Sequence, residues 1–270
     1  MRYQEILPLP ALQAYIRYFW VLESGEEQVG SKQFKILPDG IPALIYQDTP
    51  NLFRDEHHRS TPQLYIYGAF TTYTNQLVDG PFRIIGAYLE STALKAIFKL
   101  DASELANQNV ALDELVSTSL LDQLQHASTT EEKIRLLSDF VLQQVQALHY
   151  DNQKAKFAST LLQRGLSLTE VQTQMNLSER TLERLIKQHV GMSPKLFSRI
   201  MRFQTSLELL KTTDFNTLTT LVYEQDYFDQ SHFIREFKTF TGNNPTQFLK
   251  YSEEKLSNFP EWKIEEKKKV

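Results

Sequence analysis

The sequence predicts an α+β fold in which a β-rich, barrel-like N-terminal domain precedes an all-helical C-terminal domain. The first 90 residues alternate short β-prone runs with turn residues, as in a barrel or a sandwich. Near Ser91 the apolar period lengthens to that of amphipathic helices. Beyond residue 152 the chain reads as helical throughout, and two stretches that lie 51 residues apart nearly repeat one another.

The N-terminal strands are predicted by runs of aromatic and β-branched residues. These runs are YIRYFWVLES, FKILPDGIPALIY, QLYIYGAF and FRIIGAYLE. The triplets Pro38-Asp39-Gly40 and Asp79-Gly80-Pro81 are typical of turns, because proline presets φ and glycine accepts a positive φ. We expect strands to about residue 90, arranged as a barrel-like domain.

Residues 91–148 read as helices that complete this domain. The last of them begins near Thr129 and Thr130, with Glu131 and Glu132 in its first turn, where acidic side chains favour a helix start. Its apolar residues form a stripe, which either packs on the barrel or pairs with a second copy of the chain; the sequence leaves both open. The stripe consists of Ile134, Leu137, Val141, Val145 and Leu148.

The segment HYDNQK (149–154) is the predicted domain boundary. It divides the chain into residues 1–150, a sensing or dimerisation domain, and residues 151–252, a helical domain, with a charged tail at 253–270. Helices are predicted at about 153–163, 169–175, 179–190, 194–210, 217–224, 230–240 and 245–252.

Composition narrows the class of protein. The chain has 41% hydrophobic and 23% charged residues, as ordinary globular proteins do, and it contains no cysteine. The absence of cysteine excludes disulfides and thiolate metal sites and fits the cytoplasm, where we expect the protein; no apolar run is long enough for a membrane span. Residues 1–151 carry a formal charge of −8 and residues 152–250 carry +4, so the basic half is the expected partner of a polyanion.

The repeat aligns SERTLERLIKQHVGMSPKLF (178–197) with DQSHFIREFKTFTGNNPTQF (229–248). A hydrophobic core explains why apolar positions and the two glycines coincide. It does not explain why Arg184 falls on Arg235 and Lys187 on Lys238, on the outward face of each helix.

Each repeat reads as a helix–turn–helix. Ser178 and Asp229 are suitable N-caps for the second helix of each unit, and such a helix places its N-terminal residues against base edges in the DNA major groove. The helix from Pro194 to Leu210 joins the units and spans about 25 Å at 1.5 Å per residue. Two successive major grooves lie about 34 Å apart. The widths of the two reader helices add to the length of the connecting helix, so one chain can reach both grooves.

These motifs, with LSLTEVQTQMNL before the first and YF before the second, resemble the C-terminal DNA-binding domain of the AraC/XylS family of transcription regulators. The resemblance covers about residues 152–250 and implies double-stranded DNA as partner. The sequence departs from the family in the first helix of each unit, where Gln172 and either Val222 or Tyr223 replace the usual alanine. It also departs in the turns, where Asn176 and Asp226 replace the usual glycine. By position it implies DNA contacts for Arg180, Glu183, Arg184, Lys187, Gln230, Ser231, His232, Arg235 and Lys238.

Arginine can bind guanine, glutamine can bind adenine and glutamate can accept from cytosine, so the reader residues suit base contacts. Lys187 and Lys238 lie deeper along each helix and are better placed for phosphate. His232 is either a base reader or a structural cap.

The N-terminal half, through ILPDGIPALIY, resembles a β-rich sensor domain related to cupin barrels, which implies a small-molecule effector. Aromatic side chains are the candidate pocket: Tyr18, Trp20, Tyr46, Tyr65, Tyr67 and Tyr88. An enzyme is the alternative from another class, but a cupin-type His/His/carboxylate cluster is missing and His57-His58 read as a surface loop. We therefore expect no catalysis, metal or cofactor. A regulator whose N-terminal half only forms a homodimer is a further alternative.

Overall fold

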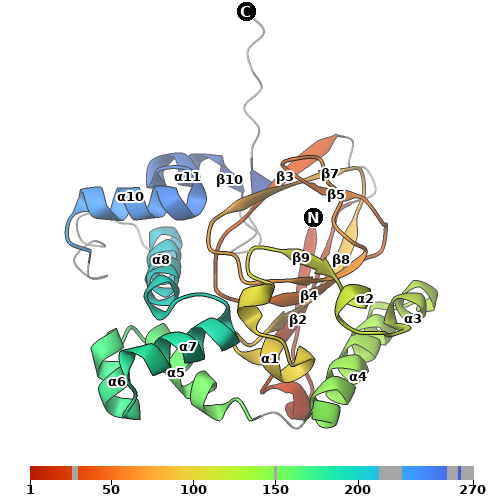
Figure 1. Ribbon diagram of the computed structural model, residues 1–270. Helices are drawn as coiled ribbons and strands as arrows, with labels where there is room; N and C mark the ends of the chain where they lie inside the picture. The colour runs from red at the N-terminus through yellow and green to blue at the C-terminus, as the bar shows by residue number, and fades with distance from the viewer. Residues whose placement is uncertain (26–29, 149–150, 213–226, 254–260, 263–270) are drawn as a thin grey trace, which may run out of the picture.

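The computed structural model describes residues 1–25, 30–148, 151–212, 227–253 and 261–262. Figure 1 shows two β-sheets beside a helical region, with α1–α4 below the sheets and α5–α8, α10 and α11 together on the left of the view. The predicted α+β class is confirmed. The predicted helix at 217–224 and the turn at Asp226 lie outside the described residues, as do Val222 and Tyr223.

The strands form two sheets, each of them antiparallel, rather than one closed barrel. The larger sheet has the order β1-β2-β8-β4-β6-β9 and the smaller has the order β10-β11-β3-β7-β5, with no strand pairing that closes one sheet onto the other among the described residues. The strands of the larger sheet are β1 (Arg2–Ile6), β2 (Ile16–Glu23), β4 (Ala43–Gln47), β6 (Leu64–Tyr67), β8 (Arg83–Leu89) and β9 (Asn109–Ala111). Those of the smaller are β3 (Ser31–Ile36), β5 (Phe53–Asp55), β7 (Thr74–Asp79), β10 (Ser252–Glu253) and β11 (Glu261–Trp262).

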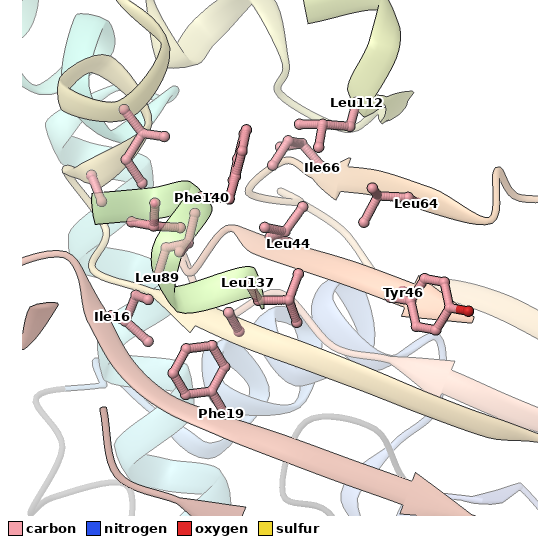
Figure 2. Packing of buried hydrophobic residues seen from close by; sticks show 14 of the residues in the cluster. Ile16, Phe19, Leu44, Tyr46, Leu64, Ile66, Leu89, Leu112, Leu137 and Phe140 are labelled. Carbon is pink, nitrogen blue, oxygen red and sulfur yellow. The ribbon is translucent and has the colours of Figure 1, made fainter. Parts of the chain in front are cut away.

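The larger sheet is covered on both faces, which explains why β4 is buried along its whole length. One face packs against the smaller sheet through Trp20, Phe34, Ile45 and their neighbours. The other face packs against helices, and Figure 2 shows Leu137 and Phe140 lying over Phe19 and Leu44. Because adjacent strand residues point to opposite faces, Ile45 and Tyr46 belong to different cores.

The helices that cover the sheet follow the predicted region 91–148. They are α1 (Ala93–Phe98), α2 (Leu112–Leu115), α3 (Leu120–His126) and α4 (Thr130–Leu148), with short 3₁₀ turns η1 (Pro10–Leu12) and η2 (Ala102–Glu104). Leu137 and Val141 of the α4 stripe are buried in the sheet core. The stripe therefore packs on the sheet, as the first of the two interpretations had it.

The C-terminal helices are α5 (Gln153–Gln163), α6 (Leu168–Met175), α7 (Glu179–Val190), α8 (Pro194–Thr212), α10 (Gln230–Thr241) and α11 (Pro245–Tyr251). They share one core, to which α8 contributes Phe197, Ile200, Phe203 and Leu207. Leu37 and Ala69 of the N-terminal half belong to the same core, so the two halves pack directly on each other. In the described part of the 253–270 tail, β11 pairs with β3, and Glu253 ends β10, which pairs with β11. None of the helices in the described part of the chain is long and apolar enough to cross a membrane.

Candidate nucleic-acid interface

The first helix–turn–helix unit, α6 and α7, is built by local capping. Ser167 caps α6 in a reciprocal pair with Glu170, whose carboxylate accepts from the Ser167 amide at 2.8 Å. Asn176 ends α6 with φ 51°, the left-handed geometry that asparagine tolerates and that the turn requires. Ser178 then caps α7 by accepting a hydrogen bond from the Thr181 amide. The departure from glycine at residue 176 therefore leaves the turn intact.

The second unit repeats this construction around α10. Asp229 caps α10 by accepting from the His232 amide at 2.6 Å, and Gly242 ends it at φ 75°, as Gly191 ends α7 at φ 93°. Leu182 and Ile186 of α7 are buried in the shared core, as are their counterparts Phe233 and Phe237 of α10. Over the described residues, the second helix of each repeat thus has the same construction, and α8 lies between α7 and α10 in the chain.

The predicted reader residues lie on the outer faces of α7 and α10. Those that are exposed are Arg180, Glu183, Arg184, Lys187, Gln230, Ser231, Arg235 and Lys238. No ion pair is formed by the five cations of this set within the described part of the chain. The N-terminal ends of both helices point away from the sheets (Figure 1). Exposed cations therefore lie on both reader helices, whose N-terminal ends lie on the same side of the molecule (Figure 1).

His232 differs from the other reader residues because it is partly buried. Its Nδ1 accepts a hydrogen bond from the Phe228 amide at 3.4 Å, and its ring packs edge-on against Tyr227 with ring centroids 5.5 Å apart. These contacts favour the capping interpretation of His232 over base reading.

Glu236 is a residue of this region that the sequence did not single out. Its side chain is only 2% exposed and accepts from Arg199 Nε at 2.8 Å and from Arg202 Nη2 at 2.9 Å. Both arginines belong to α8, so the two ion pairs join α10 to the connecting helix. A glutamate among the polar residues of an amphipathic helix looks like a solvent-exposed residue, and no local signal distinguishes this one.

The C-terminal ends of both reader helices rest on the N-terminal half. A Cβ added to Gly191 would lie 2.9 Å from the Ala102 carbonyl oxygen, and one added to Gly242 would lie 2.5 Å from Cζ of Tyr73. Lys35, a buried residue of β3, donates from Nζ to the Thr241 carbonyl at 2.8 Å and to Asn243 Oδ1 at 2.7 Å, at the end of α10. Burial lowers the pKa of Lys35 to about 8.

The connecting helix α8 also contacts the N-terminal half. Gln204 Nε2 donates to the Pro38 carbonyl at 2.7 Å, and the Phe197 ring lies against Gly40. Gly40 has φ 67°, so the predicted Pro38-Asp39-Gly40 turn is present and also serves as a contact surface.

The candidate effector residues divide between two places. Trp20, Tyr65, Tyr67 and Tyr88 line a cavity of about 30 Å³ between the sheets, together with Ile36, Ala43, Ile45, Phe53, Gln76 and Ile84. Tyr46 lies on the opposite face of the larger sheet, with Lys133 Nζ 5.3 Å from its ring centroid. Tyr18 does not line the cavity but packs edge-on against Tyr88. Trp20 Nε1 and the Tyr67 hydroxyl have no hydrogen-bond partner among the described residues.

Comparison with known proteins finds a matching family for each half of the chain. Residues 171–251 match the family described as a helix-turn-helix domain, and residues 4–111 match a domain of unknown function, DUF6597. The chain is 32% identical over 74 residues to an uncharacterized HTH-type transcriptional regulator from Haemophilus influenzae. That alignment covers 27% of this chain and spans 24% of the relative, about a quarter of its length.

Among solved structures, ToxT from Vibrio cholerae matches at a TM-score of 0.46 and 13% identity, covering 86% of this chain and 97% of that one. A form of ToxT described as unsaturated fatty acid bound matches at 0.44 and 12%, covering 86% and 94%.

The repeated geometry and the family match define the C-terminal region as a DNA-binding domain of the helix–turn–helix class. More narrowly, its sequence repeat and its connecting helix α8 resemble an AraC/XylS-type domain, and the β-rich domain precedes it in the chain.

Proposed function

We propose that this protein is a sequence-specific transcription regulator that places α7 and α10 in two successive major grooves of double-stranded DNA. The observation that carries the proposal is the matched pair of exposed cationic faces on α7 and α10, two helices whose N-terminal ends both point away from the sheets (Figure 1). The connecting helix α8 has 19 residues, a length of roughly 28 Å, which suits the spacing of about 34 Å between grooves once the helix widths are added.

Each reader residue has a role that its chemistry supports. Arg180, Arg184 and Arg235 suit bidentate contact with guanine, Gln230 suits adenine and Glu183 suits cytosine. Lys187 and Lys238 lie in the last turn of each helix and suit phosphate. Ser231 can donate to either, while His232 holds the helix start.

The test is a DNA-binding titration of the full chain at several salt concentrations. Binding through Lys and Arg releases condensed counterions, so log affinity should fall linearly with log salt. A folded chain that binds no DNA, or binds it without salt dependence, would make the double helix–turn–helix a protein-interaction module instead.

We infer that the β-rich half senses a small molecule in the aromatic cavity. Ile36 and Ala43 line the cavity, and the loop between them carries Pro38 and Gly40, which contact α8. A cavity of about 30 Å³ holds little more than water, so a larger ligand must displace its walls. Displacement at Ile36 or Ala43 then reaches α8, and a ligand that favours one arrangement shifts DNA affinity by its differential binding.

Trp20 provides a direct assay for such a ligand. The chain has two tryptophans, so Trp262→Phe leaves Trp20 as the sole indole reporter. An effector in the cavity should change the Trp20 emission and the DNA affinity at the same concentration. If one metabolite shifts DNA affinity without changing the emission, the effector binds elsewhere. If no metabolite of a broad panel changes either, the domain serves assembly instead.

The function is proposed as regulation rather than catalysis because exposed cations recur at matching positions on α7 and α10. The residues that the structure describes form no group of three or more metal-ligating side chains. A homodimer and a cytoplasmic location remain predictions of the sequence.

A further inference from the structure

A polar groove of about 820 Å³ lies between the two helix–turn–helix units. One wall is the turn between α5 and α6, the other is α10 at His232 and Glu236, and one face of α8 lies between them. The sequence does not predict this groove, because its residues are far apart in the chain and only His232 and Glu236 belong to a reader helix.

Cationic side chains dominate the groove. Four basic side chains and one carboxylate line it: Arg164, Lys195, Arg199, Arg202 and Glu236. Arg199 and Arg202 are fastened to Glu236, whereas Arg164 and Lys195 are exposed and form no ion pair within the described ranges. Two cations of the groove are therefore available to an anion from outside.

Three residues with hydroxyl groups also line the groove: Ser167, Ser198 and Thr205. Ser198 Oγ is buried on the floor of the groove and has no hydrogen-bond partner among the residues that the structure describes. Thr205 is exposed and donates to the Met201 carbonyl within α8 at 3.2 Å. Ser198 lies one turn from Lys195 on the same helix, and its buried Oγ is not open to a ligand in this arrangement.

The position of the groove relative to the reader helices indicates which part of the DNA would contact it. When two reader helices occupy successive major grooves on one side of B-DNA, the segment between them presents the minor groove and the phosphate strands on its edges. The groove includes Leu168 at the start of α6 and His232, which follows the reader residues Gln230 and Ser231 at the start of α10. A phosphate strand would therefore run over it when both readers are seated.

We infer that this groove receives the DNA phosphate backbone between the two major grooves, with Lys195 and Arg164 neutralising phosphates. The inference rests on the proposed DNA binding and adds a third contact surface to it. Contacts of this kind carry no sequence information, so they set affinity and register but not the consensus.

The test compares Lys195→Ala, Arg164→Ala and the double variant of the full chain, titrated on one bound DNA sequence at several salt concentrations. Lys154→Ala is the matched control, since Lys154 is an exposed cation of α5 that does not line the groove. Each single variant should reduce the salt slope by about 0.9, the value for one phosphate contact, and the double variant by about twice that. The control should keep the wild-type slope, and Lys195→Arg should restore it.

Three results would overturn the inference in distinguishable ways. If the double variant binds DNA with the wild-type salt slope, the groove does not contact phosphates, although the proposed DNA binding is unaffected. A wild-type chain that binds no DNA removes both. Inorganic phosphate alone, at matched ionic strength, should not stabilise the wild type more than Lys195→Ala against heat; if it does, and DNA affinity is unchanged, the groove is a site for a free anion.

Discussion

The docking of both reader helices on the N-terminal half predicts a specific ranking of glycine substitutions. The backbone angle φ is 86° at Gly165, 93° at Gly191 and 75° at Gly242. Alanine at any of these positions therefore meets a similar backbone penalty of about 1 kcal/mol. Around Gly165 nothing lies within 4 Å of an added Cβ. At Gly242 the new methyl would lie 2.5 Å from Tyr73 Cζ, which adds an overpacking cost of about 1–3 kcal/mol.

The expected loss is therefore about 1 kcal/mol for Gly165→Ala and about 2–4 kcal/mol for Gly242→Ala. Urea unfolding measures both. In a Tyr73→Ala background the excess at Gly242 should vanish, because the ring that meets the methyl is gone, while the loss at Gly165 should persist. If Gly242→Ala and Gly165→Ala lose the same stability in both backgrounds, α10 does not rest on Tyr73 and the docking argument fails.

Three further predictions concern charge. Glu236→Ala should lower the free energy of unfolding by about 2–3 kcal/mol. This is less than the roughly 3–5 kcal/mol lost when a fully buried ion pair is broken, because Arg199 and Arg202 are partly exposed. A loss within roughly 0.5 kcal/mol, the range of neutral surface changes, would count against the network. Lys187→Ala should weaken binding to all DNA sequences alike and reduce the salt slope by about 1, as titrations on unrelated duplexes would show. Burial lowers the pKa of His189 below its ordinary 6.5, so the unfolded chain takes up the proton first and stability should fall as pH drops from 6.5 toward the folded-state pKa; unfolding midpoints at pH 7.5 and 5.5 should differ more for the wild type than for His189→Gln.

The helical half could be predicted closely because its signals are local. Cap residues, left-handed terminators and apolar spacing all act within a few residues, so α7 has the predicted bounds 179–190 and Gly191 and Gly242 end their helices. The exposed positions of the reader cations follow from the same period. A repeat that matched charge as well as core was the signal that separated a binding face from a solvated one.

The contacts between the halves could not be predicted, since they depend on residues distant in the chain. Lys35 reads as an ordinary strand lysine, yet it is buried and donates to the end of α10. Tyr46 and Ile45 are both apolar in a strand buried on both faces, so the pattern could not show that only Ile45 lines the cavity. Two open sheets and one barrel likewise share the same run of short strands, so closure was not determined by the strand pattern.

The central claim, that α7 and α10 read two successive major grooves, is tested most directly by selecting bound sequences from random DNA with the full-length protein. The account predicts a bipartite consensus with its two halves about one helical turn, or about 10 bp, apart. Arg184→Ala should relax one half and Arg235→Ala the other, each by about 1–3 kcal/mol of discrimination. A consensus confined to one groove, or one that both variants degrade uniformly, would contradict the account.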